Sequence, residues 1–161
     1  MTPNVQAFLA MLSASEGTDR PPAPDNPYRC CFGFKHIIKD LSDHPTITGE
    51  WMGESIANLG PQYAHSISSA AGKYQIIRPT WISAKLALNL HDFTAPSQDD
   101  AAIYLIKQKG ALELINSGRV ADAINLCHEI WASLPGSTAN QPQTSFAALM
   151  MAYSKAGGAF A

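Results

Sequence analysis

The segment FLAMLSASEGTDR, residues 8–20, contains a glutamate at a position where a helix face requires an apolar side chain. The preceding apolar residues follow the i, i+3, i+4, i+7 spacing of a helix that packs on a core, at Val5, Phe8, Leu9 and Leu12. At 100° per residue, Glu16 falls within roughly 20° of Val5 around the helix axis. The spacing therefore directs the carboxyl group of Glu16 towards the same apolar face.

This location predicts a raised pKa for the Glu16 carboxyl group, because burial disfavours the charged form. The negative pole at the C-terminal end of a helix acts in the same direction. No basic residue lies three or four positions before Glu16, although Arg20 lies four positions after it. A carboxyl group that stays protonated near neutral pH is suited to general acid catalysis, as in glycoside cleavage. The alternative is that Glu16 only caps or snorkels at a frayed helix end.

Other kinds of catalytic chemistry leave no trace in the sequence. The five histidines include no pair at i, i+3 or i+4, and neither H-E-x-x-H nor C-x-x-C occurs. Motifs for a serine nucleophile (G-x-S-x-G) or for phosphate binding (G-x-G-x-x-G, P-loop) are also missing. The three cysteines, Cys30, Cys31 and Cys127, show no disulfide framework spacing and are expected to be reduced and buried.

Pro and Gly residues, which favour turns and end helices, divide the first part of the chain into short elements. A helix is expected over residues 3–15, with Thr2 as N-cap, Pro3 in the first turn and Gly17 as the stop. The proline-rich stretch 18–27 reads as a loop. The elements expected next are a short, bent strand over 28–34, strand character at 36–38, no clear assignment for 42–69, a β-edge or turn over 70–77, and a helix from Pro79 to Leu90.

After residue 95 the chain becomes helical, and this change sets the fold class. Helices are expected from Pro96 to Lys107 and over 111–116, 120–131 and 146–155, the last ending at Gly157. A first helix, a small β-containing lobe and then several helices predict an α+β fold in a single domain of 161 residues.

Composition narrows the range of partners. The chain is 46% apolar and 15% charged with a net charge of −2, which fits a globular protein and gives no electrostatic case for a nucleic-acid binder. No apolar run approaches the roughly 18 residues of a membrane span. The N-terminal residues carry neither a basic segment nor an A-x-A cleavage site, so we expect no signal peptide and synthesis in the cytoplasm.

Five blocks in a fixed order resemble a known family. They are AFLAMLSASEGTD (7–19), SDHP (42–45), AAGKYQI (70–76), SQDDAAIYLIKQKGAL (97–112) and IWASLPG (130–136). Together they resemble the endolysin family of bacteriophage lambda over nearly the whole chain. The resemblance implies a lysozyme-like α+β fold with a cleft between a helical lobe and a small β-containing lobe. It also implies cleavage of the β-1,4 bond between N-acetylmuramic acid and N-acetylglucosamine in peptidoglycan.

The resemblance further implies the type of reaction and the residues that carry it. The glutamate of the S-E-G-T motif is the family's catalytic acid, which corresponds to Glu16. The family reaction is lytic transglycosylation, which leaves a 1,6-anhydromuramic end and needs no metal or cofactor. Glycan contacts are expected from residues in or near the family motifs: Tyr28, Arg29, Gly72, Tyr74, Gln75 and Gln141. Tyr74 would offer a ring to sugar faces, Gln75 an amide to N-acetyl groups, and Gly72 a close backbone approach; alternatively, Tyr74 is a core aromatic with a bonded hydroxyl.

Two departures from the family pattern affect the details of substrate binding. Arg29 stands where the family has an aspartate, and it is expected to contact carboxylates of the stem peptide. The run 137–141 lacks the aromatic residue that the family has after ASLPG, so Gln141 is the polar residue carried over there. Trp81 and Trp131 are expected in the core.

Two other functions stay open at this point. A hydrolytic muramidase would need a second carboxylate, at about 5 Å for retention or about 6.5–9.5 Å for inversion. The candidates are Asp19, Asp25, Asp43, Glu50 and Glu54, of which Asp43 can instead tie down its own turn. The other possibility is a non-catalytic module that binds the cell wall.

The resemblance also implies where the protein works. It is expected to be a monomer that accumulates in the host cytoplasm, makes no stable membrane association and reaches the peptidoglycan glycan strands through a separate holin. Segment 46–69, which carries Trp51 and Tyr63, is a candidate mobile flap.

Overall fold

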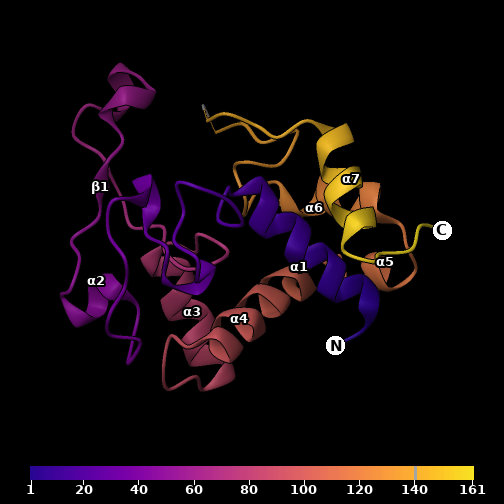
Figure 1. Ribbon diagram of the computed structural model, residues 1–161, viewed down its shortest axis with the longest axis horizontal. Helices are drawn as coiled ribbons and strands as arrows, with labels where there is room; N and C mark the ends of the chain where they lie inside the picture. Colours follow the sequence, from indigo (N-terminus) through magenta and orange to yellow (C-terminus); the bar gives the residue numbers. More distant parts are fainter. Residues whose placement is uncertain (140) are drawn as a thin grey trace. The chain divides into compact units, whose positions relative to one another are not determined.

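The computed structural model describes residues 1–139 and 141–161. The chain divides into two compact units, drawn in Figure 1. Unit 1 combines Met1–Glu16 with Ala102–Ala161, and unit 2 is the stretch Gly17–Ala101 between them. The prediction of a single domain therefore stays a prediction, and each unit is described by itself.

Unit 1 begins with the helix that carries the apolar stripe, α1 (Pro3–Ser15). The Thr2 side chain accepts a hydrogen bond from the Val5 amide at 3.3 Å, and Pro3 occupies the first turn, where its missing N–H costs nothing. The helix ends at Glu16, and Gly17 follows with a φ of +71°. That left-handed conformation favours glycine, so the predicted bounds, cap and stop are all confirmed.

Unit 1 also contains the second part of α4 (Ala95–Gln108), from Ala102 on, and the helices α5 (Leu112–Asn116), α6 (Val120–Cys127) and α7 (Phe146–Lys155). Helix α1 packs against α7 and α5, as Figure 1 shows. Helix α7 has the predicted bounds, whereas α6 ends four residues before the predicted position. The chain turns after Cys127, and Trp131 is nevertheless 2% exposed, which confirms it as a core residue.

Unit 2 contains mostly short elements. In chain order they are the 3₁₀ helices η1 (Pro27–Arg29) and η2 (Phe32–Phe34), α2 (Pro45–Thr48), β1 (Glu54–Ser55), η3 (Ala57–Leu59), η4 (Pro61–Tyr63), β2 (Ile67–Ser68), α3 (Arg78–Leu88) and the first part of α4 (Ala95–Gln108). Strands β1 and β2 pair antiparallel, with Glu54 opposite Ser68. Together with the helices of unit 1, this small sheet confirms the α+β class.

The predicted strand over 28–34 is wrong. The Asn26 side chain caps η1 by accepting from the Tyr28 amide, and Gly33, with a φ of +78°, bends the chain within η2. Only single bridges remain, between Cys30 and Ile37 and between Cys31 and Ala71. The aromatic and thiol side chains that suggested a strand are accommodated by tight turns instead.

The stretch 70–77 forms a turn closed by a bridge between Ala71 and Ile76. Both amides of that pair bond to the partner carbonyl, at 3.2 and 3.0 Å. Of the two alternatives weighed for this stretch, the turn is the one observed. Helix α3 then begins at Arg78 and ends at Leu88, close to the predicted bounds.

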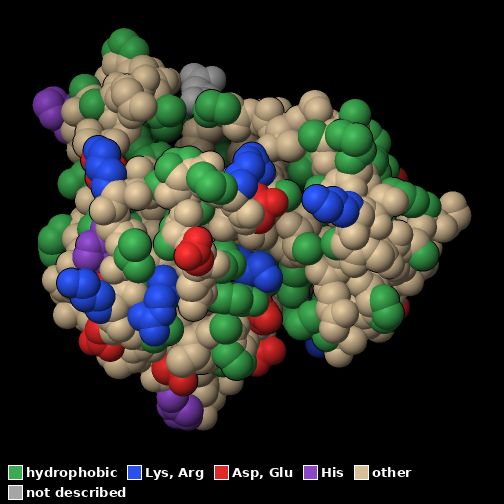
Figure 2. All heavy atoms as spheres, in the orientation of Figure 1, with side chains coloured by type: hydrophobic (Ala, Val, Ile, Leu, Met, Phe, Trp, Pro, Cys, Tyr) green, Lys and Arg blue, Asp and Glu red, His purple; other side chains and the backbone are tan. Residues whose placement is uncertain are grey.

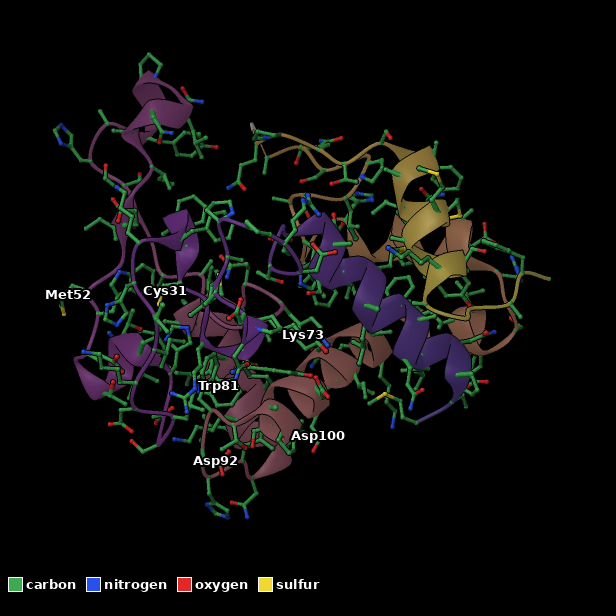
Figure 3. The ribbon with its side chains drawn as sticks, viewed as in Figure 1. Cys31, Met52, Lys73, Trp81, Asp92 and Asp100 are labelled. Atoms are coloured by element: carbon green, nitrogen blue, oxygen red, sulfur yellow. The ribbon has the colours of Figure 1, made fainter. Side chains whose placement is uncertain are left out.

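The β1–β2 hairpin and its 3₁₀ turns account for most of segment 46–69. Met52, at the base of the hairpin, is 76% exposed and points away from the rest of unit 2 in Figure 3. Trp51 beside it is only 9% exposed. The flap hypothesis stays a prediction.

The core of unit 2 is built around Trp81, which is fully buried as predicted (Figure 3). Its ring contacts Phe93 edge-on at 4.7 Å between centroids, and Phe93 contacts His44 at 5.0 Å. Cys30 and Cys31 in this unit, and Cys127 in unit 1, are buried, which confirms the expected burial. Among the described residues, no helix is long and apolar enough to cross a membrane.

Candidate active site

A chain of hydroxyl groups ends on the Glu16 carboxyl group in unit 1. Ser15 Oγ donates a hydrogen bond to Ser133 Oγ at 2.7 Å, and Ser133 Oγ donates to Glu16 Oε1 at 2.6 Å. Both lengths lie within the usual range of O–H···O hydrogen bonds. The two serines therefore approach the glutamate from its own helix and from the turn after α6.

Burial raises the pKa of Glu16 from 4.5 to about 7, and the hydrogen bond from Ser133 acts in the opposite direction. Desolvation is the dominant effect, because a buried carboxylate loses more hydration than a single hydroxyl donor replaces. The raised pKa expected from helix periodicity is thus confirmed. At neutral pH the group exists in comparable amounts as acid and carboxylate, which is the condition under which it can both give and take a proton.

The turn that presents Ser133 is held at both ends. Trp131 and Leu134, on either side, are 2% and 0% exposed and anchor the turn in the core of unit 1. Thr144 braces it from the segment before α7: its amide donates to the Ser133 carbonyl at 2.8 Å, and its hydroxyl donates to the Ser15 carbonyl at 3.4 Å. The backbone therefore fixes both serines independently of their hydroxyl groups.

Unit 2 contains a second polar cluster, centred on Asp99 in α4. Asp99 Oδ1 accepts hydrogen bonds from Tyr74 Oη at 2.6 Å and from Tyr28 Oη at 2.9 Å. Lys73 Nζ donates to Tyr28 Oη at 3.1 Å and lies over both tyrosine rings, 4.9 and 5.3 Å from their centroids. Thr18 donates to the Lys73 carbonyl at 2.7 Å, so a threonine and the G-K-Y-Q motif are joined within this unit.

Tyr74 and Gly72, two expected glycan contacts, both have close neighbours within unit 2. The Tyr74 ring is fully buried and offers no face to a sugar, which corrects that expectation in favour of the alternative, a core aromatic with a bonded hydroxyl. Gly72 does allow a close approach, but to Gln98: a Cβ at Gly72 would lie 2.7 Å from Gln98 Cδ. Gln98 Oε1 in turn accepts from the Lys73 amide at 2.9 Å.

The other expected contacts are Gln75, Arg29, Tyr28 and Gln141. Gln75 Nε2 donates to the Gly72 carbonyl at 2.9 Å. Arg29 Nη1 donates to the carbonyls of Ile38 and Lys39 at 2.7 and 3.0 Å, so the guanidinium group holds that loop. Tyr28 and Gln141 are partly exposed, and the Gln141 amide donates to the Ala139 carbonyl.

Sequence reasoning missed Ser133, Lys73 and Asp99 as members of these clusters. Each lies inside a block that carried the family resemblance, which was the available signal. Helix periodicity gave no indication of them, because their partners are distant in sequence.

Three of the candidate second carboxylates bind groups of unit 2. Asp43 Oδ1 accepts from Trp81 Nε1 and the His44 amide, both at 2.8 Å, and Oδ2 pairs with Lys85. Glu50 accepts from the amides of residues 39 and 40 and contacts His36 Nε2, and Glu54 pairs with Lys35. The hydrogen bonds outweigh the effect of burial and lower the pKa of Asp43 and of Glu50. The role of Asp43 in its own turn is thereby confirmed.

The fold matches solved structures over its full length. A bacteriophage lambda lysozyme complexed with a chitohexasaccharide is 34% identical and covers 100% of this chain and 98% of its own, with a TM-score of 0.85. A second lambda lysozyme structure is 33% identical with the same coverage and a TM-score of 0.82. These matches define a lysozyme-like protein.

Comparison of sequences identifies the family. The endolysin family model matches residues 6–160. The endolysin of Escherichia phage P2 is 36% identical over 159 residues, covering 96% of this chain and 93% of its own, and that of Escherichia phage lambda is 36% identical over 155 residues, covering 95% and 90%. The chain belongs to the endolysin family.

Proposed function

We propose that this endolysin cleaves the β-1,4 bond between N-acetylmuramic acid and N-acetylglucosamine by lytic transglycosylation, with Glu16 as both acid and base. As a lysozyme-like endolysin, the chain is a peptidoglycan-cleaving enzyme. The proposal concerns the type of cleavage and the residue responsible. The observation that carries it is the partly buried Glu16 carboxyl group, whose pKa of about 7 suits both proton transfers.

The reaction consumes no water. Protonated Glu16 gives its proton to the glycosidic oxygen as the bond from that oxygen to muramyl C1 breaks. The muramyl C6 hydroxyl attacks C1 and forms the 1,6-anhydro bond, and its proton returns to the Glu16 carboxylate. An attacking group within the same sugar has a high effective concentration, so no positioned water is required.

Hydrolysis is the competing reaction type. It would require a second carboxylate to stabilise or attack C1, or to activate water. The engagement of Asp43, Glu50 and Glu54 by Lys85, by backbone amides and by Lys35 argues against these three in that role. One carboxyl group that cycles between acid and base is sufficient for the transglycosylase.

Product analysis on purified peptidoglycan distinguishes the two reactions. Mass spectrometry of the released muropeptides should find anhydromuramic ends, 18 mass units lighter than the hydrolytic products, about the mass of one water. Reducing muramic ends would contradict lytic transglycosylation.

Glu16→Gln tests the catalytic residue separately. We expect a loss of at least about 10²–10⁴-fold in lysis, the usual value of general acid catalysis, while the variant still sediments with cell walls. A fully lytic Glu16→Gln would refute the assignment. A non-catalytic wall-binding module would show sedimentation without cleavage in the unmodified protein.

Substrate binding and access to the wall complete the proposal. A complex of lambda lysozyme with a chitohexasaccharide supports glycan strands as the ligand. We assign contacts with the glycan to Tyr28, Gln75 and Gln141, and contacts with stem-peptide carboxylates to the remaining donors of Arg29. The enzyme would act as a monomer on the cell wall after a holin opens the membrane.

A further inference from the structure

The hydrogen bonds of Ser15 and Ser133 beside Glu16 run in one direction, from Ser15 through Ser133 to Glu16. This direction affects how Glu16 can take part in the reaction. Ser15 Oγ donates into Ser133 Oγ, so the single hydrogen of the Ser133 hydroxyl remains for Glu16 Oε1. A serine hydroxyl has one donor and two acceptor positions, and this arrangement uses the donor and one acceptor. Ser133 is therefore oriented by Ser15 to donate to Glu16 and not to accept from it.

We propose that Ser133, oriented by Ser15, is a positioning residue that holds Glu16 Oε1 and assigns the exchange of the proton with the glycan to Oε2. This inference rests on the proposed function of Glu16 as acid and base. A carboxyl group that donates and recovers one proton in a turnover can use the same oxygen for both steps if it does not rotate between them. A hydroxyl that donates to the other oxygen prevents rotation of the carboxyl group between them.

The same hydrogen bond stabilises the carboxylate that exists between the two proton transfers. A donor to an ionised oxygen is about twice as strong as a donor to a neutral one. The Ser133 bond therefore strengthens when Glu16 gives up its proton and weakens when the proton returns. Its effect on Glu16 is accordingly opposite to that of burial.

The supports of this pair distinguish it from a chance contact. Ser15 is 8% exposed, and Ser133 lies in a turn between two buried side chains. Thr144 holds the backbone of both serines. Removing either hydroxyl therefore leaves the backbone restraints in place, which makes substitution a clean test.

The variants are Ser133→Ala, Ser133→Thr and Ser15→Ala, with Ser154→Ala as control, because Ser154 is an exposed serine in α7. In Ser133→Ala we expect kcat to fall about tenfold to a hundredfold, the usual effect of losing a hydrogen bond to a charged group. KM should stay constant, since Ser133 binds the carboxyl group and not the glycan. Ser133→Thr keeps a hydroxyl and should restore most of the rate, and Ser154→Ala should match the unmodified enzyme.

The pH profile separates positioning from a structural role. In the unmodified enzyme kcat/KM should fall as pH rises through about 7, where Glu16 loses its proton. Ser133→Ala should move this alkaline limb to higher pH, because the lost bond favoured the ionised form. Ser15→Ala should move it less in the same direction. A limb that stays in place in Ser133→Ala, or that moves as far in Ser133→Thr as in Ser133→Ala, would overturn the inference.

A measurement without substrate keeps this inference separate from the reaction type. The Glu16 carboxyl carbon can be titrated by ¹³C NMR, with Glu16→Gln used to assign its signal. An upward shift of its midpoint in Ser133→Ala supports the role of Ser133 even if product analysis finds hydrolysis. An unchanged midpoint overturns that role even if anhydromuramic products are found. Should Ser133→Ala fail to fold, Ser15→Ala carries the same test, because it removes the group that orients Ser133.

Discussion

Burial of Glu16 destabilises the folded chain at neutral pH, and Glu16→Gln should remove that cost. The pKa of Glu16 is about 7 in the folded chain, compared with 4.5 for an ordinary, exposed glutamate. A difference of one in pKa corresponds to about 1.4 kcal/mol. A group with a raised folded pKa contributes stability that is fully present below about pH 4.5 and is lost as pH rises to about 7. The free energy of unfolding should therefore fall by about 3 kcal/mol across this range because of Glu16 alone.

The introduced amide cannot ionise, yet it can still accept the Ser133 hydrogen bond through its oxygen. Relative to the unmodified protein, Glu16→Gln should gain about 3 kcal/mol between pH 4 and pH 8. For a chain of this length, the gain corresponds to about 6–12 °C in Tm. Groups with lowered pKa, such as Asp43 and Glu50, act in both proteins and cancel in the difference.

The assay is urea unfolding of both proteins at pH 4, 6 and 8, compared as differences at each pH. Glu129→Gln provides a control of opposite sign. Lys109 lowers the pKa of Glu129, so this variant should lose stability relative to the unmodified protein as pH rises. A stability difference for Glu16→Gln that is the same at pH 4 and pH 8 would refute the buried-acid account.

Two further variants test residues in unit 2. Gly72→Ala should lower the free energy of unfolding in urea by at least about 2 kcal/mol, because the new Cβ meets Gln98 and φ is +77°. The control Gly110→Ala, at a φ of +71° with no atom within 4 Å of the new Cβ, should lower it by only about 1 kcal/mol. Equal losses in the two variants would contradict a role for the contact with Gln98. Asp43→Asn weakens the pair with Lys85 and should lower the free energy of unfolding by about 1 kcal/mol. Muropeptide release per folded molecule should stay within about threefold of the unmodified enzyme. A drop of about a thousandfold would instead identify Asp43 as the second carboxylate of a hydrolase.

The local sequence pattern was sufficient to predict features that depend on a single helix. The bounds of α1 and α7, the stop at Gly17 and the unfavourable environment of Glu16 follow from the 3.6-residue period and from caps within a few positions. On the face drawn in Figure 2, basic and acidic side chains are interspersed, and the net charge of the sequence is −2. These features depend on nearest neighbours in the chain.

The rest could not be predicted, because it depends on partners far away in sequence. Tyr74 is buried because Asp99, 25 positions on, accepts its hydroxyl hydrogen. Gly72 is needed because Gln98 occupies the space of its side chain. The run at 28–34 has strand composition, but Pro27 and the left-handed Gly33 form turns. Composition alone cannot weigh these backbone restraints against β propensity.

The discontinuity of unit 1 has a consequence for how the enzyme is made. Residues 17–101 are synthesised between the two parts of that unit, so α1 leaves the ribosome long before α5 and α7, on which it packs. Glu16 and Ser133 are 117 positions apart, and a contact of this span forms only after a large loop has closed. A nascent chain can therefore complete the contacts internal to unit 2 while its proposed acid still lacks its hydroxyl partner. Under the proposed function, lytic competence therefore depends on the last fifth of the chain, which is translated last.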